Sequence, residues 1–287
     1  MVVLDVNDFS VLCAQSYPNY DLDKYMNDPQ YREDLLLNKD GQNAMWNRCF
    51  WQGYPIGSAM KPAVALAALQ EGVIDTSTQF RCGYTYYNAD MPDFHPLCMG
   101  THGYLNVIEA LTVSCNIFFY DTGYNLGIDN MNLYQRKLGL GELTGVEIYE
   151  SDGTLAGPDE KEDWYGGDTI MAAIGQSDNL ITPVQLATYA ATIANNGTRL
   201  RTHVVDKITD YSRQTVLEET KPEVVEENIF DQEVLETVKG AMRNVVTSPS
   251  VPVITATAPM KSRSRRKRER PRPICLTATN MTWIILR

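Results

Sequence analysis

The chain has 287 residues, of which 44% are hydrophobic, and a formal net charge of −11 at pH 7. Nine of the 25 Lys and Arg residues, but one of the 36 Asp and Glu residues, lie in 261–287, so residues 1–260 carry a net charge of −19. Such an acidic body argues against nucleic-acid binding and gives no attraction to an anionic membrane surface. The length suits one large domain, and the apolar runs are too short and too polar for a membrane span or signal peptide.

The first residues predict a pair of strands. Residues 2–6 and 10–16 have strand composition, and the Asn7-Asp8 pair between them is typical of a turn. Because a strand follows Met1 at once, we expect the chain to start within a domain.

A serine and a lysine three residues apart open the next predicted element. Gly57 precedes Ser58, the run after Lys61 is a strong helix former, and Gly72 ends it, so we expect one helix over 58–71. Residues at i and i+3 share a helix face, which brings the Lys61 amine toward the Ser58 hydroxyl. A desolvated amine can act as the base for a serine nucleophile. Alone, the pair is also compatible with a helix cap and a solvated lysine.

A second polar motif interrupts an apolar helical run. Residues 106–120 have helical spacing but break at Ser114-Cys115-Asn116. Buried polar groups need partners, and a helix–helix hydrogen bond or a cap would supply one. A Ser-x-x-Lys motif followed some fifty residues later by Ser-x-Asn instead favours a serine acyl-transfer site.

With these motifs, the stretch from Val2 to about Ser250 resembles the transpeptidase domain of class B penicillin-binding proteins, of the elongation or sporulation type. Further matching segments are 17–21, 47–48, 100–103, 138–140, 174–179, 182–186 and 194–198. The resemblance implies an α/β (α+β) fold, with an antiparallel sheet flanked by helices and an all-helical subdomain that holds the Ser-x-Asn motif.

The resemblance also implies a role for each motif residue. Ser58 would be the acylated nucleophile, Lys61 its base, Ser114 a proton relay to the leaving amine, and Asn116 a contact to Lys61 and to the substrate amide. The reaction would be peptidoglycan D,D-transpeptidation, an acyl transfer from D-Ala-D-Ala stem peptides, and β-lactams would trap the same serine. No cofactor is required for this chemistry.

The third motif of the family is missing from the sequence. A Lys-Thr/Ser-Gly strand should bind the substrate carboxylate and complete the oxyanion hole, yet no such triplet occurs. Residues 251–287 form a basic, low-complexity tail without strand or helix periodicity. We therefore expect a partial transpeptidase domain over 1–250 whose C-terminal strands are missing, a disordered tail, and an inactive chain.

A frame change explains this tail. Codons for Lys-Thr-Gly-Thr-Ala, read one nucleotide later, encode Lys-Arg-Glu-Arg-Pro, which is residues 267–271. We interpret 251–287 as out-of-frame. Three alternatives stay open for the chain: a natural basic tail that binds nucleic acid or anionic lipid, a β-lactam sensor or β-lactamase on the same fold, and a non-enzymatic fragment.

Four cysteine and histidine residues gather in a tyrosine-rich insert. Cys82, His95, Cys98 and His102 could hold a structural zinc, and some clostridial-type relatives are similar in having a metal here. Asp90 or Asp93 could replace a histidine; a disulfide or two free thiols at Cys82 and Cys98 are the other possibilities. For Cys13 and Cys115, elsewhere in the chain, we expect buried thiols.

The resemblance further implies partners and location. Stem peptides, β-lactams and cell-wall synthesis proteins would be the partners, without nucleic acid. The parent family is anchored in the cell membrane with an extracytoplasmic domain, and we expect this chain to lack the anchor and the domain that precede the transpeptidase.

Overall fold

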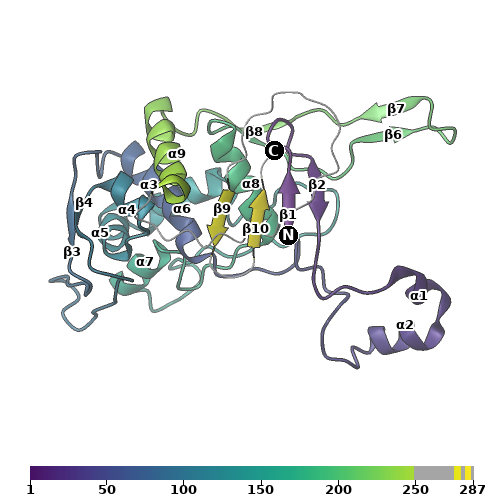
Figure 1. Cartoon of the computed structure of the whole chain (residues 1–287), viewed down its shortest axis with the longest axis horizontal. Coiled ribbons are helices and arrows are strands. Elements are labelled where there is room, and N and C mark those ends of the chain that lie inside the picture. The colour runs from purple at the N-terminus through teal and green to yellow at the C-terminus, as the bar shows by residue number, and fades with distance from the viewer. Residues whose placement is uncertain (249–274, 279–281, 286–287) are drawn as a thin grey trace.

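The computed structural model describes residues 1–248, 275–278 and 282–285. A small sheet lies at the centre of the molecule, a helical lobe lies on one side of it, and two projections extend on the other (Figure 1). This mixed architecture of helices and strands agrees with the predicted fold class. None of the helices in these residues is long and apolar enough to cross a membrane.

The central sheet begins with the predicted strand pair. Strands β1 (Val2–Leu4) and β2 (Val11–Ala14) pair antiparallel. Val2 and Leu4 are fully buried, as expected where alternate residues of a strand face a core. The helix α8 (Pro183–Ala194), buried along nearly its whole length, packs against β1.

Two further strands complete this sheet. β9 (Cys275–Ala278) and β10 (Thr282–Ile285) pair antiparallel, and β10 pairs parallel with β1, which gives the order β2-β1-β10-β9. The expectation that the tail has no strand is wrong for these eight residues, because Thr, Ile and Trp in them favour extended backbone. The basic run expected to be disordered lies outside the described residues.

The helical lobe is built around α3 (Lys61–Gln70). Its residues 61–68 are all buried, because α3 packs against helices on several sides. The helices of the lobe that contact it are α4 (Val107–Thr112), α5 (Asn116–Leu126), α6 (Ile128–Lys137) and α9 (Gln232–Thr247). A further helix, α7 (Gly166–Ala172), packs on α5. The two helices approach closely at Gly123 of α5, where an added side chain would overlap Ala173.

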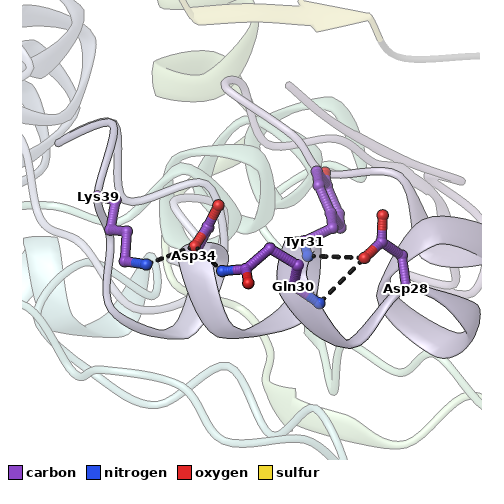
Figure 2. Close-up of polar contacts among 5 residues, drawn as sticks. All are labelled: Asp28, Gln30, Tyr31, Asp34 and Lys39. Atoms are coloured by element: carbon purple, nitrogen blue, oxygen red, sulfur yellow. Dashed lines mark hydrogen bonds and ion pairs between the residues drawn. The ribbon is translucent and has the colours of Figure 1, made fainter.

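Two projections extend from this body (Figure 1). One carries α1 (Leu22–Asn27) and α2 (Pro29–Leu36), neither of which has a buried residue. Figure 2 shows how α2 is held by local contacts: Asp28 accepts from the backbone N–H groups of Gln30 and Tyr31, and Asp34 pairs with Lys39 at 2.6 Å. These charges are exposed, so solvent screens the ion pair and it adds little to stability.

The second projection is the hairpin of β6 (Lys207–Thr209) and β7 (Val216–Glu219). Two other short pairs complete the described strands. β5 (Arg199–Leu200) pairs with β8 (Val224–Glu226), and β3 (Phe80–Cys82) pairs with β4 (Gly103–Leu105) at the edge of the helical lobe.

Candidate active site

Ser58 lies in a 3-10 turn that leads directly into α3. The turn spans Gly57–Met60, so the single helix predicted over 58–71 is in fact a 3-10 turn followed by an α-helix from Lys61. The Lys61 backbone N–H donates to the Ser58 carbonyl, which closes the turn, and the Ser58 side chain is exposed. The nucleophile candidate therefore faces solvent immediately before the buried helix.

Two residues that are distant in the sequence contact this turn and hold it in place. The Gly57 N–H donates to the Gly175 carbonyl at 3.0 Å, and a side chain at Gly175 would overlap the Gly57 backbone. Gly175 also has φ +70°, a conformation that favours glycine. The hydroxyl of the buried Tyr189 donates to the Ala59 carbonyl at 3.2 Å. The sequence signals Gly175 only through the family match at 174–179, and it gives no signal for Tyr189.

The Lys61 amine is buried and fully hydrogen-bonded. The residue is 1% exposed. Its Nζ donates to the Ser114 carbonyl at 2.8 Å, to Ser114 Oγ at 3.0 Å and to Asn116 Oδ1 at 2.7 Å. Burial disfavours the charged amine and lowers its pKa to about 8, although the neighbouring Cys98 and Cys115 oppose that shift. A substantial share of neutral amine therefore exists near pH 8.

The predicted break in the helix over 106–120 is confirmed. α4 ends at Thr112 and α5 begins at Asn116, with Ser114 at φ +55° in the turn between them. The Asn116 amide nitrogen donates to the Leu97 carbonyl at 3.3 Å, which leaves Oδ1 to face Lys61. The structure thus joins three of the four predicted catalytic residues by hydrogen bonds, while Ser58 is held near them by the turn.

This arrangement can support acyl transfer to a serine. A neutral Lys61 amine can take a proton, and the Ser114 hydroxyl can pass a proton onward. The family's third motif has no counterpart in the sequence. The strand β9 lies beside the Ser58 turn.

A cluster of three thiols and an imidazole adjoins the predicted catalytic residues. The donor atoms of Cys82, Cys98, His102 and Cys115 all lie within 4.8 Å of one another. His102 Nδ1 is 3.4 Å from Cys82 Sγ and 3.6 Å from Cys98 Sγ, and the Cys98 and Cys115 sulfurs are 3.9 Å apart. The thiols of Cys98 and Cys115 share a hydrogen bond, and this contact lowers the pKa of Cys98 and raises that of Cys115.

The cluster differs from the predicted ligand set in one member. His95 lies elsewhere, with Nδ1 3.3 Å from the Tyr86 carbonyl and its ring against Tyr87. Cys115, expected to be a plain buried thiol, takes the fourth position. The position of Cys115 between Ser114 and Asn116 was the one feature of the sequence that could have indicated its place in the cluster. Of the alternatives, Asp90 instead accepts a hydrogen bond from Tyr124, and Asp93 is exposed.

The thiols of Cys13, Cys49, Cys82, Cys98 and Cys115 are free, so Cys82 and Cys98 form no disulfide. Cys13 is half-buried rather than buried. The donor set of three sulfurs and one nitrogen suits zinc. Bond lengths of about 2.3 Å to sulfur and 2.0 Å to nitrogen place tetrahedral ligands about 3.5–3.8 Å apart. The separations of 3.4, 3.6 and 3.9 Å in the cluster are close to that spacing.

Comparison with known proteins shows the family and the fold. Residues 1–261 match the family model of the penicillin binding protein transpeptidase domain. Peptidoglycan D,D-transpeptidase MrdA of Acinetobacter baumannii is 31% identical over 212 residues, which are 71% of this chain and 32% of the relative. The MrdA protein of Haemophilus influenzae is 32% identical over 215 residues, which are 72% of this chain and 33% of the relative.

Solved structures give the same result. PBP2 of Pseudomonas aeruginosa in complex with WCK 5153 matches with a TM-score of 0.74 and 26% identity over 86% of this chain and 57% of that one. A structure described as a peptidoglycan synthase complex that coordinates polymerization and crosslinking matches with a TM-score of 0.74 and 29% identity, over 86% of this chain and 42% of that one.

The fold and the surroundings of Lys61 define the class of penicillin-recognising, active-site-serine domains. The chain belongs to the penicillin-binding protein transpeptidase domain family, and its relatives are of the class B, PBP2/MrdA type. It spans about a third of the length of the curated relatives it matches.

Proposed function

We propose that this chain carries the serine acyl-transfer site of a peptidoglycan D,D-transpeptidase. The observation that carries the proposal is the buried Lys61 amine, whose Nζ contacts both Ser114 and Asn116 one turn after Ser58. The names of the MrdA relatives support the same activity. The substrate would be the D-Ala-D-Ala end of a stem peptide.

The residues divide the reaction between them. Ser58 Oγ attacks the penultimate D-Ala carbonyl while the neutral Lys61 amine takes its proton. Ser114 hands a proton to the leaving D-alanine nitrogen, and the C–N bond breaks to give the Ser58 ester. An incoming amine then attacks this ester and restores the Ser58 hydroxyl. Asn116 orients Lys61 throughout and contacts the substrate amide.

The missing Lys-Thr-Gly motif limits this reaction. Loss of one oxyanion-hole donor costs about 10²–10³ in rate in other enzymes, and loss of the carboxylate contact adds to that cost. We infer that the chain does not complete transpeptidation on a stem peptide. A β-lactam, whose strained ring lowers the barrier to attack, still acylates Ser58 slowly.

Labelling with a fluorescent penicillin tests the proposal. We expect slow labelling that a Ser58→Ala variant abolishes, at least a hundredfold slower than that of a relative with the third motif. Rapid labelling would contradict the inferred loss of activity. Labelling that persists in Ser58→Ala would contradict the assignment of the nucleophile.

The synthase complex among the similar structures supports a partner for this domain. We propose that the parent protein works outside the cytoplasmic membrane with other cell-wall synthesis proteins. Co-purification of the full-length parent with such a protein tests this proposal, and failure of the two to associate would contradict it.

We also propose that the thiol cluster holds a structural zinc. Cys82, Cys98 and Cys115 are each at most 4% exposed, and a buried set of three sulfurs and an imidazole nitrogen is a common zinc site. Bound there, the metal would link β3 and the insert to the start of α5. One equivalent of zinc in the purified protein is expected, and protein without metal after growth in zinc-supplemented medium would contradict the proposal.

A further inference from the structure

Three aromatic side chains form a row of rings on the surface, which we call the aromatic platform: Trp46, Trp51 and Tyr149. The ring centroids of Trp46 and Trp51 are 5.5 Å apart, and those of Trp51 and Tyr149 are 6.0 Å apart, both in edge-to-face geometry. The two outer rings are open to solvent, since Trp46 is 46% exposed and Tyr149 is 75% exposed. Trp51, the middle ring, packs against the hydrophobic core. The platform therefore presents two large exposed rings on an anchored third ring.

Contacts between segments that are distant in the sequence hold the platform together. The Trp51 indole N–H donates to the Tyr149 carbonyl at 2.9 Å. Beside it, the backbone N–H of Ser151 donates to the Phe50 carbonyl at 2.8 Å. Rings that are already fixed lose little conformational entropy when a ligand covers them, so a rigid aromatic surface is suited to binding.

The exposed Trp46 is held by its backbone. The guanidinium of Arg48 donates to the carbonyls of Gln42, Asn43 and Trp46, at 3.0, 3.1 and 3.3 Å. The Trp46 backbone N–H also donates to the Asn43 carbonyl at 3.0 Å. These contacts fix the position of the residue and leave the indole ring open to solvent.

The free groups of the two outer rings match the surface of a sugar. Within the part of the chain that the structure describes, neither the Trp46 indole N–H nor the Tyr149 hydroxyl has a hydrogen-bond partner. Each ring thus offers an apolar face beside an unused polar group. A pyranose ring has the same combination, with C–H groups on one face and hydroxyls around its edge, so it can stack on the ring and bond the polar group at once.

The size and charge of the platform disfavour other occupants. The exposed parts of Trp46 and Tyr149 amount to about 300 Å² together, because an aromatic side chain has up to about 250 Å² of surface. A stable protein interface buries roughly 800 Å² on each partner, which is far more. Residues 1–260 carry a net charge of −19, which repels an anionic membrane or a nucleic acid. An uncharged oligosaccharide meets neither obstacle.

The platform also lies within reach of the proposed nucleophile. Ser58 follows Trp51 by seven residues, so their Cα atoms are at most about 25 Å apart. An extended stem peptide of about five residues spans up to about 17 Å. One substrate molecule, with its glycan and its stem peptide, is therefore long enough to contact both places.

We infer that the aromatic platform binds the glycan strand of peptidoglycan, with β-1,4-linked N-acetylhexosamine rings stacked on Trp46 and Tyr149. The assignment to peptidoglycan rests on the proposed function, whereas the stacking of sugar rings is independent of it. The platform would hold the strand while the stem peptide extends toward Ser58.

Titration of the full chain with chitotetraose tests this inference, because that probe has β-1,4-linked N-acetylglucosamine units and no peptide. Tryptophan fluorescence and calorimetry should show saturable binding that is tighter than for the disaccharide. The affinity should fall at least tenfold in Trp46→Ala and in Tyr149→Ala, while Trp46→Phe, which keeps a ring, should recover part of it. Tyr211→Ala is the matched control: Tyr211 is 105% exposed, lies outside the platform and should not affect binding.

The outcomes separate the platform from the acyl-transfer site. No saturable binding of chitotetraose, equal binding by Trp46→Ala and the unsubstituted chain, or equal weakening by Tyr211→Ala would overturn the inference. So would binding to phosphatidylglycerol vesicles that Trp46→Ala abolishes, without binding of the sugar. A penicillin contains no glycan, so its reaction with Ser58 reports on the proposed function alone. Sugar binding by a chain that penicillin never labels would leave the platform standing and remove the proposed function.

Discussion

Asn116 Oδ1 and Lys61 Nζ are joined by a hydrogen bond of 2.7 Å inside the helical lobe. Because the amide is neutral, it orients the amine without adding a negative charge beside it. A carboxylate in the same place would favour the charged form of the amine. An amide at this position is therefore compatible with the proposed role of Lys61 as a base.

An Asn116→Asp variant tests this relationship. The new carboxylate should raise the pKa of Lys61, so acylation at pH 7.5 should fall by about tenfold or more and recover at higher pH. The pH–rate profile of penicillin labelling measures the shift. Asn116→Ala is the control, because it removes the acceptor without adding charge; an unshifted profile in Asn116→Asp would contradict the proposed role.

The pKa of Lys61 should set the pH dependence of Ser58 acylation in the unsubstituted chain. Burial lowers the pKa to about 8, and the neutral amine is the reactive form. The acylation rate should therefore rise about tenfold per pH unit below that value and level off above it. Lys61→Arg, which stays charged at every accessible pH, should show no measurable acylation. A rate that is constant between pH 6 and 9 would exclude Lys61 as the base.

Gly175 should be indispensable for the Ser58 turn. A methyl group there would overlap the Gly57 backbone, so Gly175→Ala should displace the turn, lower the melting temperature and reduce Ser58 acylation. Gly72→Ala is the matched control. Gly72 has φ +65°, close to the +70° of Gly175, but a Cβ there meets nothing within 4 Å. Both variants bear the backbone cost of about 1 kcal/mol, and loss of acylation in Gly72→Ala as well would argue against a specific contact.

The frame-change hypothesis for residues 251–287 predicts the sequence of the encoding DNA. Read in the frame shifted by one nucleotide, the codons that give residues 267–271 should encode Lys-Thr-Gly-Thr-Ala. Sequencing this region decides the matter, and the absence of a Lys-Thr/Ser-Gly triplet from the shifted frame would refute the frame-change hypothesis. A chain with the restored motif should be acylated at least a hundredfold faster.

Local patterns in the sequence were sufficient to predict the first strand pair and to single out Lys61, Ser114 and Asn116, which the structure brings together. Ser58 and Lys61 are three residues apart, a spacing that brings them together in a 3-10 turn as well as in an α-helix, so the error in helix type was harmless. The polar break at 114–116 marked a helix boundary for the same local reason.

The contacts that depend on tertiary packing could not be predicted in this way. His95 is closer to Cys98 in sequence than Cys115 is, yet the insert directs His95 toward Tyr86 while the start of α5 brings Cys115 to the cluster. The contact of Gly57 with Gly175 joins residues more than a hundred positions apart. Neither periodicity nor motif spacing carries information about such distances.

Intact-mass spectrometry of the chain after long incubation with penicillin G tests the central claim most directly. We predict one penicilloyl adduct, which peptide analysis maps to the segment that contains Ser58. The adduct should not form in Ser58→Ala, nor in protein that is unfolded before the incubation. An adduct on another residue would contradict the assignment of Ser58 and Lys61 as nucleophile and base. So would the absence of any adduct after an incubation a thousand times longer than a relative with the third motif needs for complete labelling.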